Sequence, residues 1–214
     1  MIVHNLGDQP SIANQFLTEL RDPATQKNRA LFRYNLARLG EFMAYEISKK
    51  LSYRQDVIHT SLGSKTVQLP ETSPVLLTIL RAGLPFLEGF QRVFDQSETG
   101  FIGAYRVEGK SDLQIQADYV AMPGLEGKTV VLLDTMLATG KSVVAAIELL
   151  LTRGRPSHVH LASVIAAPEG IQHLKEEIKI PCSFWTFAID EKLNADFYIV
   201  PGLGDAGDLS FGPK

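Results

Sequence analysis

Three near-continuous apolar runs, rather than alternating ones, dominate the middle of the chain. They cover residues 75–80, 129–133 and 159–166, and helical patterns follow them at 84–94, 141–153 and 169–177. Continuous apolar runs are typical of strands that are buried on both faces, as in a parallel sheet between helices. Because strands and helices alternate, the pattern predicts an α/β fold with a mostly parallel sheet flanked by helices.

A helical pattern also fills the segment before these runs. Apolar residues recur at near-helical spacing up to residue 51, and Asp22-Pro23 resembles a helix start, with Asp22 as N-cap and Pro23 in the first helical position. The pattern therefore predicts one long amphipathic helix over 23–51. Asn35 is the one polar residue in its apolar stripe, and we expect its side chain to be hydrogen bonded or partly exposed.

Shorter patterns predict a hairpin and three further strands. Residues 57–61 and 66–69 are strand-like and are joined through Gly63 and Ser64, which favours a small β-hairpin. The other predicted strands are 101–106, 183–189 and 197–200.

Two segments show no regular period. Residues 107–127 are polar, and we interpret them as a flexible flap, with a plain surface loop as the alternative. The C-terminal residues 201–214 contain four glycines and two prolines in 14 residues. This content is too rich in backbone breakers for a helix or a strand, and predicts either disorder or a closely fitted loop.

Composition narrows the class of protein. The 214 residues carry a formal net charge of −3, with 45% hydrophobic and 21% charged residues, as expected for a single globular domain over 1–214. The mild acidity argues weakly against nucleic acid as a partner. With one cysteine, Cys182, the chain cannot form an internal disulfide. The N-terminus does not resemble a signal peptide and no apolar run is long enough to span a bilayer, so we expect a cytoplasmic protein without membrane association.

The most informative segment is VVLLDTMLATGKS at 130–142, where a buried strand leads through a short loop into a helix. Ligands of parallel α/β sheets bind at the carboxyl ends of strands, and a loop that opens a helix presents backbone N–H groups suited to phosphate. Asp134 would repel phosphate, so it suits sugar hydroxyls or a metal, and the segment indicates a phosphorylated sugar. An NTPase P-loop is the competing reading, but Thr135 stands where that motif requires glycine. A strand–turn–helix without function is the other alternative.

Five motifs carry a resemblance to a known family over about residues 22–214. The segment DTMLATGKS at 134–142 resembles the phosphoribosyl-pyrophosphate loop of type I phosphoribosyltransferases, in the form found in uracil phosphoribosyltransferases. LRAGL at 80–84 resembles that family's pyrophosphate loop, and AAPEG at 166–170 its strand-to-helix turn. AIDEKLN at 188–194 and YIVPGLGDAGD at 198–208 resemble its uracil-binding hood, which we place at 183–214. The resemblance implies the transfer of a phosphoribosyl group to uracil, giving UMP and pyrophosphate in pyrimidine salvage.

The resemblance also implies roles for particular residues. It places Arg81 and Arg106 on the pyrophosphate, where a planar guanidinium gives paired hydrogen bonds, and makes Arg81, Arg106, Asp134 and Asp205 the catalytic set. The residues implied for phosphoribosyl pyrophosphate are Arg81, Arg106, Asp134, Thr135, Met136, Leu137, Ala138, Thr139, Gly140, Lys141, Ser142 and Asp205. Those implied for uracil are Ile199, Gly204, Asp205 and Ala206.

The expected cofactor is Mg²⁺, carried mainly by substrate and water rather than by a cage of protein ligands. The five histidines match no ligand spacing. A homodimer or a larger homo-oligomer is implied by the resemblance, whereas nothing in the sequence identifies a site for the GTP that activates some members.

The chain departs from the family pattern at two positions of the loop. Thr135 replaces the usual proline, and Lys141 replaces the usual glycine, which would strain the backbone if position 141 requires a positive φ. Leu209 also follows Asp208 where a basic residue is common. Two alternatives remain: an RNA-binding regulator with the same fold, and a sister enzyme that acts on another base.

Overall fold

A seven-stranded sheet forms the centre of the molecule, in the order β1-β11-β9-β7-β4-β5-β6. The computed structural model describes residues 1–106 and 115–213. All neighbouring strands are parallel except β6, which pairs antiparallel with β5. The strands are β1 (Ile2–Asn5), β4 (Val75–Leu80), β5 (Thr99–Arg106), β6 (Ile115–Ala121), β7 (Thr129–Leu133), β9 (His158–Ala162) and β11 (Cys182–Thr186). The predicted fold class is confirmed.

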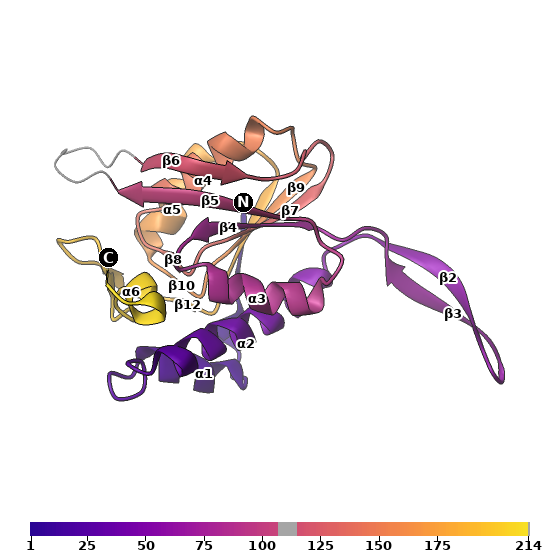
Figure 1. The fold of residues 1–214 in the computed structure, drawn as a ribbon, viewed down its shortest axis with the longest axis horizontal. Helices are drawn as coiled ribbons and strands as arrows, with labels where there is room; N and C mark the ends of the chain where they lie inside the picture. The colour runs from indigo at the N-terminus through magenta and orange to yellow at the C-terminus, as the bar shows by residue number, and fades with distance from the viewer. Residues whose placement is uncertain (107–114, 214) are drawn as a thin grey trace.

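Helices cover both faces of this sheet (Figure 1). One face packs against α1 (Ala13–Arg21), α2 (Arg29–Ser48) and α3 (Leu84–Val93), and the other against α4 (Lys141–Leu151) and α5 (Pro168–Glu177). The central strands divide their side chains between the two cores. Leu76 and Val131 join the first core, whereas Leu77 and Val130 join the second. The continuous apolar runs arise because both faces of these strands are buried.

Smaller sheets surround the carboxyl ends of the central strands. β8 (Met136–Leu137), β10 (Ile165–Ala166) and β12 (Ala188–Ile189) form a parallel three-stranded sheet, and β13 (Lys192–Leu193) pairs antiparallel with β14 (Ile199–Val200). The predicted runs 159–166 and 183–189 are therefore each divided into two strands, one in the central sheet and one in the three-stranded sheet.

The predicted hairpin is confirmed and is longer than expected. β2 (Tyr53–Thr60) and β3 (Gly63–Pro70) pair antiparallel along their whole length, and the hairpin projects away from the body of the molecule (Figure 1). Nearly all of its residues are exposed.

The prediction of one helix over 23–51 is wrong at its start. α1 ends at Arg21, and the Asp22 carboxylate accepts a hydrogen bond from the Ala24 amide (2.9 Å), which forms a turn instead of an N-cap. α2 begins at Arg29 because Asn28 is the N-cap, with its side chain accepting from the Leu31 amide (3.1 Å). Before α1, a 3-10 turn (Leu6–Asp8) follows β1.

Asn35 is fully buried and hydrogen bonded, as one of the two expectations had it. Its amide donates to the Glu19 carboxylate (2.8 Å) and its carbonyl accepts from the Arg38 guanidinium (2.9 Å). The contact ties α2 to α1.

The C-terminal segment contains a helix, which corrects the expectation that 201–214 has no regular structure. α6 (Ala206–Phe211) begins at Asp205, whose carboxylate accepts from the Asp208 amide (3.0 Å). A helix of six residues is marginal by itself, but Ala206 and Ser210 are fully buried, so tertiary packing supports it.

The predicted flap at 107–127 includes β6, which the sequence pattern did not indicate. Residues 107–114 lie outside the described part of the chain, so the flap stays a prediction. Among the helices that the structure describes, none combines the length and apolar character needed to cross a membrane.

Candidate active site

The carboxyl ends of β4, β5 and β7 lie side by side and carry the predicted charged residues. In the parallel register Thr78 of β4 pairs with Leu133 of β7, the residue before Asp134. Arg81 directly follows β4, and Arg106 is the last residue of β5. This is the edge at which parallel α/β sheets bind ligands, and the two arginines and Asp134 come to it from three adjacent strands.

Asp134 is partly buried and has a perturbed pKa. Burial raises the pKa of its carboxyl to about 6, against the opposing effect of the backbone amides of Thr135 and Met136. The Thr135 amide donates to Asp134 Oδ1 at 2.7 Å. A carboxyl group with a pKa near neutral pH at the end of a strand is typical of active sites, and it also occurs in structural ion-pair networks.

Thr135 connects three segments at this edge. Its side chain is fully buried, and its hydroxyl donates to the Ala82 carbonyl (2.8 Å) in the loop that carries Arg81. Its own carbonyl accepts from the Val164 amide (3.0 Å), between β9 and β10. Proline has no hydroxyl, so the bond to Ala82 depends on the threonine found in this chain. Thr135 and Leu137 are buried as whole residues, so neither presents side-chain surface to a ligand in this conformation.

The loop ends at the start of α4, where phosphate-binding geometry is available. Gly140 is the N-cap of α4 with a φ of 79°, a conformation that other residues adopt only with strain. Lys141 is the first helical residue, is exposed and has no positive φ, so the strain considered for this position does not arise. Ser142 follows it in the first turn, where free amides and the helix dipole favour an anion.

Arg81 reaches from the β4 loop to the C-terminal segment. Its guanidinium donates to Asp208 Oδ1 (3.1 Å) and to the Gly212 carbonyl (3.4 Å). A Cβ placed on Gly207 would lie 3.1 Å from Asp205 Oδ1 and 3.6 Å from Arg81 Nη2. The structure thus brings Arg81 together with both acids of the C-terminal motif.

The residues expected to hold uracil lie along one short stretch of chain. Ile199 and Ala206 are buried, whereas Gly204 and Asp205 are exposed. Gly202 and Gly204 both have positive φ, which bends the backbone sharply between β14 and α6. The turn therefore combines exposed backbone at Gly204 and Asp205 with buried apolar residues on either side of it in the chain.

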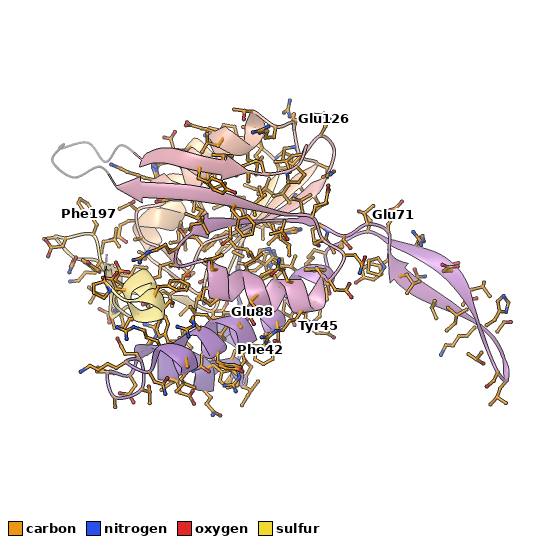
Figure 2. The ribbon with its side chains drawn as sticks, viewed as in Figure 1. Phe42, Tyr45, Glu71, Glu88, Glu126 and Phe197 are labelled. Carbon is orange, nitrogen blue, oxygen red and sulfur yellow. The ribbon has the colours of Figure 1, made fainter. Side chains whose placement is uncertain are left out.

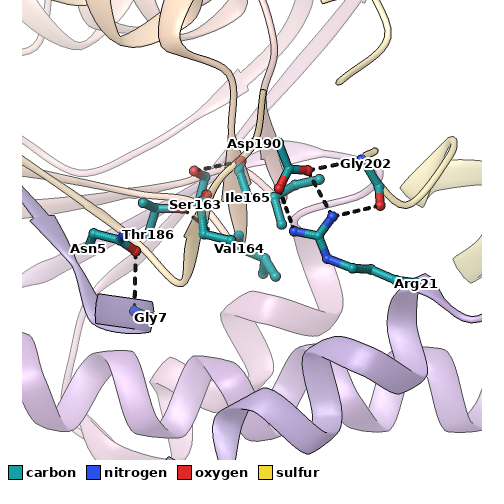
Figure 3. Close-up of polar contacts among 10 residues, drawn as sticks. Asn5, Gly7, Arg21, Ser163, Val164, Ile165, Thr186, Asp190 and Gly202 are labelled. Atoms are coloured by element: carbon teal, nitrogen blue, oxygen red, sulfur yellow. Dashed lines mark hydrogen bonds and ion pairs between the residues drawn. The ribbon is translucent and has the colours of Figure 1, made fainter. Parts of the chain in front are cut away.

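Sequence reasoning missed two residues that hold this stretch in place. Arg21 forms a bidentate ion pair with Asp190 (2.7 and 2.8 Å), and both also bind the backbone of Gly202 (Figure 3). Asp190 lies within the motif at 188–194, which gave it no separate role. Arg21 carried no signal, because its partners are far away in the chain.

A hollow in the described part of the chain lies away from these residues. It has a volume of about 550 Å³ and lies between the N-terminal segment and α2, from which Phe42 and Tyr45 project (Figure 2). The charged residues in its lining are Asp8 and Glu46, both acidic. Such a lining does not suit a polyphosphate substrate, and the hollow includes none of the predicted site residues.

The fold has a mostly parallel α/β sheet, a loop that runs from an acid at a strand end into a helix, and an arginine on the neighbouring loop. These are the features of a phosphoribosyltransferase of type I. The chain belongs, within that class, to the uracil phosphoribosyltransferase family: the family model described as "Uracil phosphoribosyltransferase" matches residues 8–213.

Individual relatives agree over the full length. The uracil phosphoribosyltransferase of Porphyromonas gingivalis is 43% identical over 215 residues and covers 100% of both chains. That of Pyrococcus furiosus is 37% identical, over 98% of this chain and 90% of the relative. Among solved structures, the AQ2163 protein from Aquifex aeolicus superposes with a TM-score of 0.87 at 32% identity, covering 99% of this chain and 98% of that one.

Proposed function

We propose that this chain transfers the phosphoribosyl group of 5-phosphoribosyl 1-pyrophosphate to uracil, which gives UMP and pyrophosphate and serves pyrimidine salvage. The observation that carries the proposal is the meeting of the Arg81 loop, the Asp134 loop and the C-terminal turn at one edge of the sheet. Family membership over residues 8–213 supports the same reaction.

The phosphorylated substrate is assigned to the two loops. The amides and hydroxyls of 139–142 bind the 5-phosphate at the start of α4, while the Asp134 carboxylate accepts hydrogen bonds from the ribose hydroxyls. Arg81 and Arg106 stabilise the negative charge that develops on the departing pyrophosphate. Arg81 is already half-exposed and held at this edge through Asp208.

Uracil is assigned to the turn between β14 and α6. Its alternating donors and acceptors pair with backbone N–H and C=O groups of 199–206, which the two glycines of positive φ bring close to the ligand. Cytosine reverses donors and acceptors, so it leaves polar backbone groups unpaired and is rejected more strongly than an added methyl group is.

Mg²⁺ fits the acids available at this edge. Within residues 1–106 and 115–213 no group of three or more potential protein ligands is placed to hold a metal. Asp134 and Asp205 would each offer carboxylate oxygen to a cation that keeps most of its ligands as water and substrate oxygens. The ion would supply positive charge to the pyrophosphate.

The reaction is tested by incubating the protein with Mg²⁺, phosphoribosyl pyrophosphate and, separately, uracil, cytosine, hypoxanthine or orotate. We expect UMP and an equal amount of pyrophosphate with uracil, and at least about 100-fold slower turnover with the other bases. Product with another base instead would indicate a sister enzyme. A folded protein that binds the pyrophosphate substrate but yields no nucleotide would contradict the enzyme assignment and favour the RNA-binding alternative.

The hairpin β2–β3 supports a homodimer. It exposes Tyr53 (44%), Val57 (52%), Ile58 (42%) and Leu62 (98%) on an element that packs mainly against itself. Such apolar surface is typical of a protein interface, and we assign it to a second copy of this chain.

Deleting the hairpin tests this assignment. The Glu71 amide donates to the Ser52 carbonyl (2.9 Å), so a short glycine linker can join the ends without disturbing the body. We expect the shortened protein to remain folded and to elute as a monomer, with its mass measured by light scattering. An unchanged dimer would place the interface elsewhere.

The cytoplasmic location stays a prediction.

A further inference from the structure

A largely buried ion pair holds the C-terminal turn in place. Arg21, the last residue of α1, donates from Nη1 and Nη2 to the two carboxylate oxygens of Asp190 at 2.8 and 2.7 Å (Figure 3). The Asp190 side chain is 6% exposed and that of Arg21 is 22% exposed. Planar bidentate pairs of this kind fix geometry as well as charge.

Both members of the pair also bind the backbone of one residue of the turn, Gly202. The Gly202 amide donates to Asp190 Oδ2 and the Gly202 carbonyl accepts from Arg21 Nη1, each at 2.9 Å (Figure 3). A Cβ on Gly202 would lie 2.1 Å from the Ile199 carbonyl oxygen, and φ is +63° there. The glycine is thus required by its conformation, and both of its polar backbone groups are bound to side chains that come from outside the turn.

The same pair connects the turn to the loop assigned to the phosphorylated substrate. The Asp190 amide donates to the Ala166 carbonyl (2.8 Å) at the end of β10. β10 pairs with β8, which lies inside the 134–142 loop. A short path of backbone hydrogen bonds thus relates the position of Gly202 to that of the phosphate loop.

We propose that Arg21 and Asp190 are positioning residues for the base. They fix the position and orientation of the 202–206 backbone, so that its hydrogen-bonding groups hold uracil in line with the phosphoribosyl group. The proposal rests on the proposed function. Neither side chain is assigned a contact with reacting atoms, and both act through Gly202. A displacement of a bound reactant by about 1 Å can lower a rate by about 100-fold. Because the pair binds the stretch assigned to uracil, its loss should affect uracil far more than phosphoribosyl pyrophosphate.

The test compares the two substrates in Arg21→Met, Arg21→Lys and Asp190→Ala. We expect the KM for uracil to rise by at least about tenfold in Arg21→Met and Asp190→Ala, while the KM for phosphoribosyl pyrophosphate changes by less than about twofold. Arg21→Lys keeps the charge but loses the paired geometry, so it should give an intermediate increase. Hydrogen exchange at the 202–206 amides should accelerate in the same order.

A double variant separates positioning from folding. Removing one member leaves an unpaired buried charge, which destabilises a protein, whereas replacing both with apolar residues of similar size restores much of the stability. We therefore expect Arg21→Met/Asp190→Leu to unfold closer to the wild type than Asp190→Ala does, yet to keep the raised KM for uracil. Arg92→Gln, which breaks an exposed arginine pair with Glu41 and Glu88, is the matched control and should change neither KM.

Two results would overturn the proposal. One is a KM for uracil that stays near the wild-type value in the double variant, and the other is an equal rise in both KM values. Failure of the wild type to form UMP would refute the proposed function instead. The positioning role would then be decided by exchange alone, and unchanged rates at 202–206 in the variants would reject it.

Discussion

Replacing Arg81 with alanine is expected to lower kcat/KM for phosphoribosyl pyrophosphate by about 100- to 1000-fold. The removal of one preorganised donor from a developing oxyanion typically costs that much. Arg81 follows β4 at the ligand-binding edge, and its guanidinium is partly exposed and able to turn toward a substrate. Arg81→Lys should recover only part of the loss, because an ammonium cannot form the paired hydrogen bonds of a guanidinium.

Stability measurements distinguish this effect from unfolding. The Arg81–Asp208 pair is 37% and 43% exposed on its two sides, and pairs of that kind contribute less than about 1 kcal/mol. We therefore expect the denaturant midpoint of Arg81→Ala to remain close to that of the wild type. Steady-state rates within about threefold of the wild type would remove Arg81 from the pyrophosphate site.

Replacing Asp134 with asparagine is expected to lower kcat/KM at about pH 8 by about 100-fold. It should also abolish the decrease of kcat/KM at acidic pH. The ionised carboxylate can accept from two ribose hydroxyls, whereas the asparagine side chain offers one acceptor oxygen. With the Asp134 pKa raised to about 6 by burial, the wild-type kcat/KM should fall about tenfold per pH unit below that value. The variant should show a flat profile over the same range, and a wild-type profile that is itself flat near pH 6 would contradict the assignment.

The same substitution should make the protein more stable. The folded pKa of about 6 lies above the ordinary 3.8, so ionisation of Asp134 opposes folding increasingly as the pH rises through this interval. A neutral amide at this position carries no such cost, and its oxygen can still accept the hydrogen bond of the Thr135 amide. Asp134→Asn should therefore raise the free energy of unfolding at about pH 8 by about 1–2 kcal/mol, measured by denaturant titration. A less active but more stable variant would identify the partly buried charge of Asp134 as functional.

Local patterns in the sequence predicted most of the central architecture. The strands at 75–80 and 129–133 and the start of the helix at 141 agree with β4, β7 and α4, because burial on both faces leaves a continuous apolar run. The sequence placed Asp134 at the end of a buried strand, but only the structure showed that this strand pairs with β4, which Arg81 follows. The motifs at 134–142 and 198–208 also indicated the family that the full-length match confirms.

The start of α2 and the presence of α6 were not predicted from the sequence. Asp22-Pro23 has the residues of a helix start, but the turn after α1 uses them instead, and Asn28 is the cap. The C-terminal segment reads as irregular because of its glycines, yet Asp205 caps α6 and the burial of Ala206 stabilises it. For α6, tertiary packing stabilises a helix that is too short to be stable by itself.

By itself, the sequence determined the layers of the fold and indicated the family, and it predicted a loop for a phosphorylated sugar at 134–142. Only the tertiary structure showed that Thr135 ties the Asp134 loop to Ala82, and that Arg21 and Asp190 hold Gly202. Arg21 and Asp190 are 169 positions apart, and Thr135 and Ala82 are 53 apart. Contacts across such separations leave no periodic or local signature, because the fold alone brings the partners within hydrogen-bonding distance.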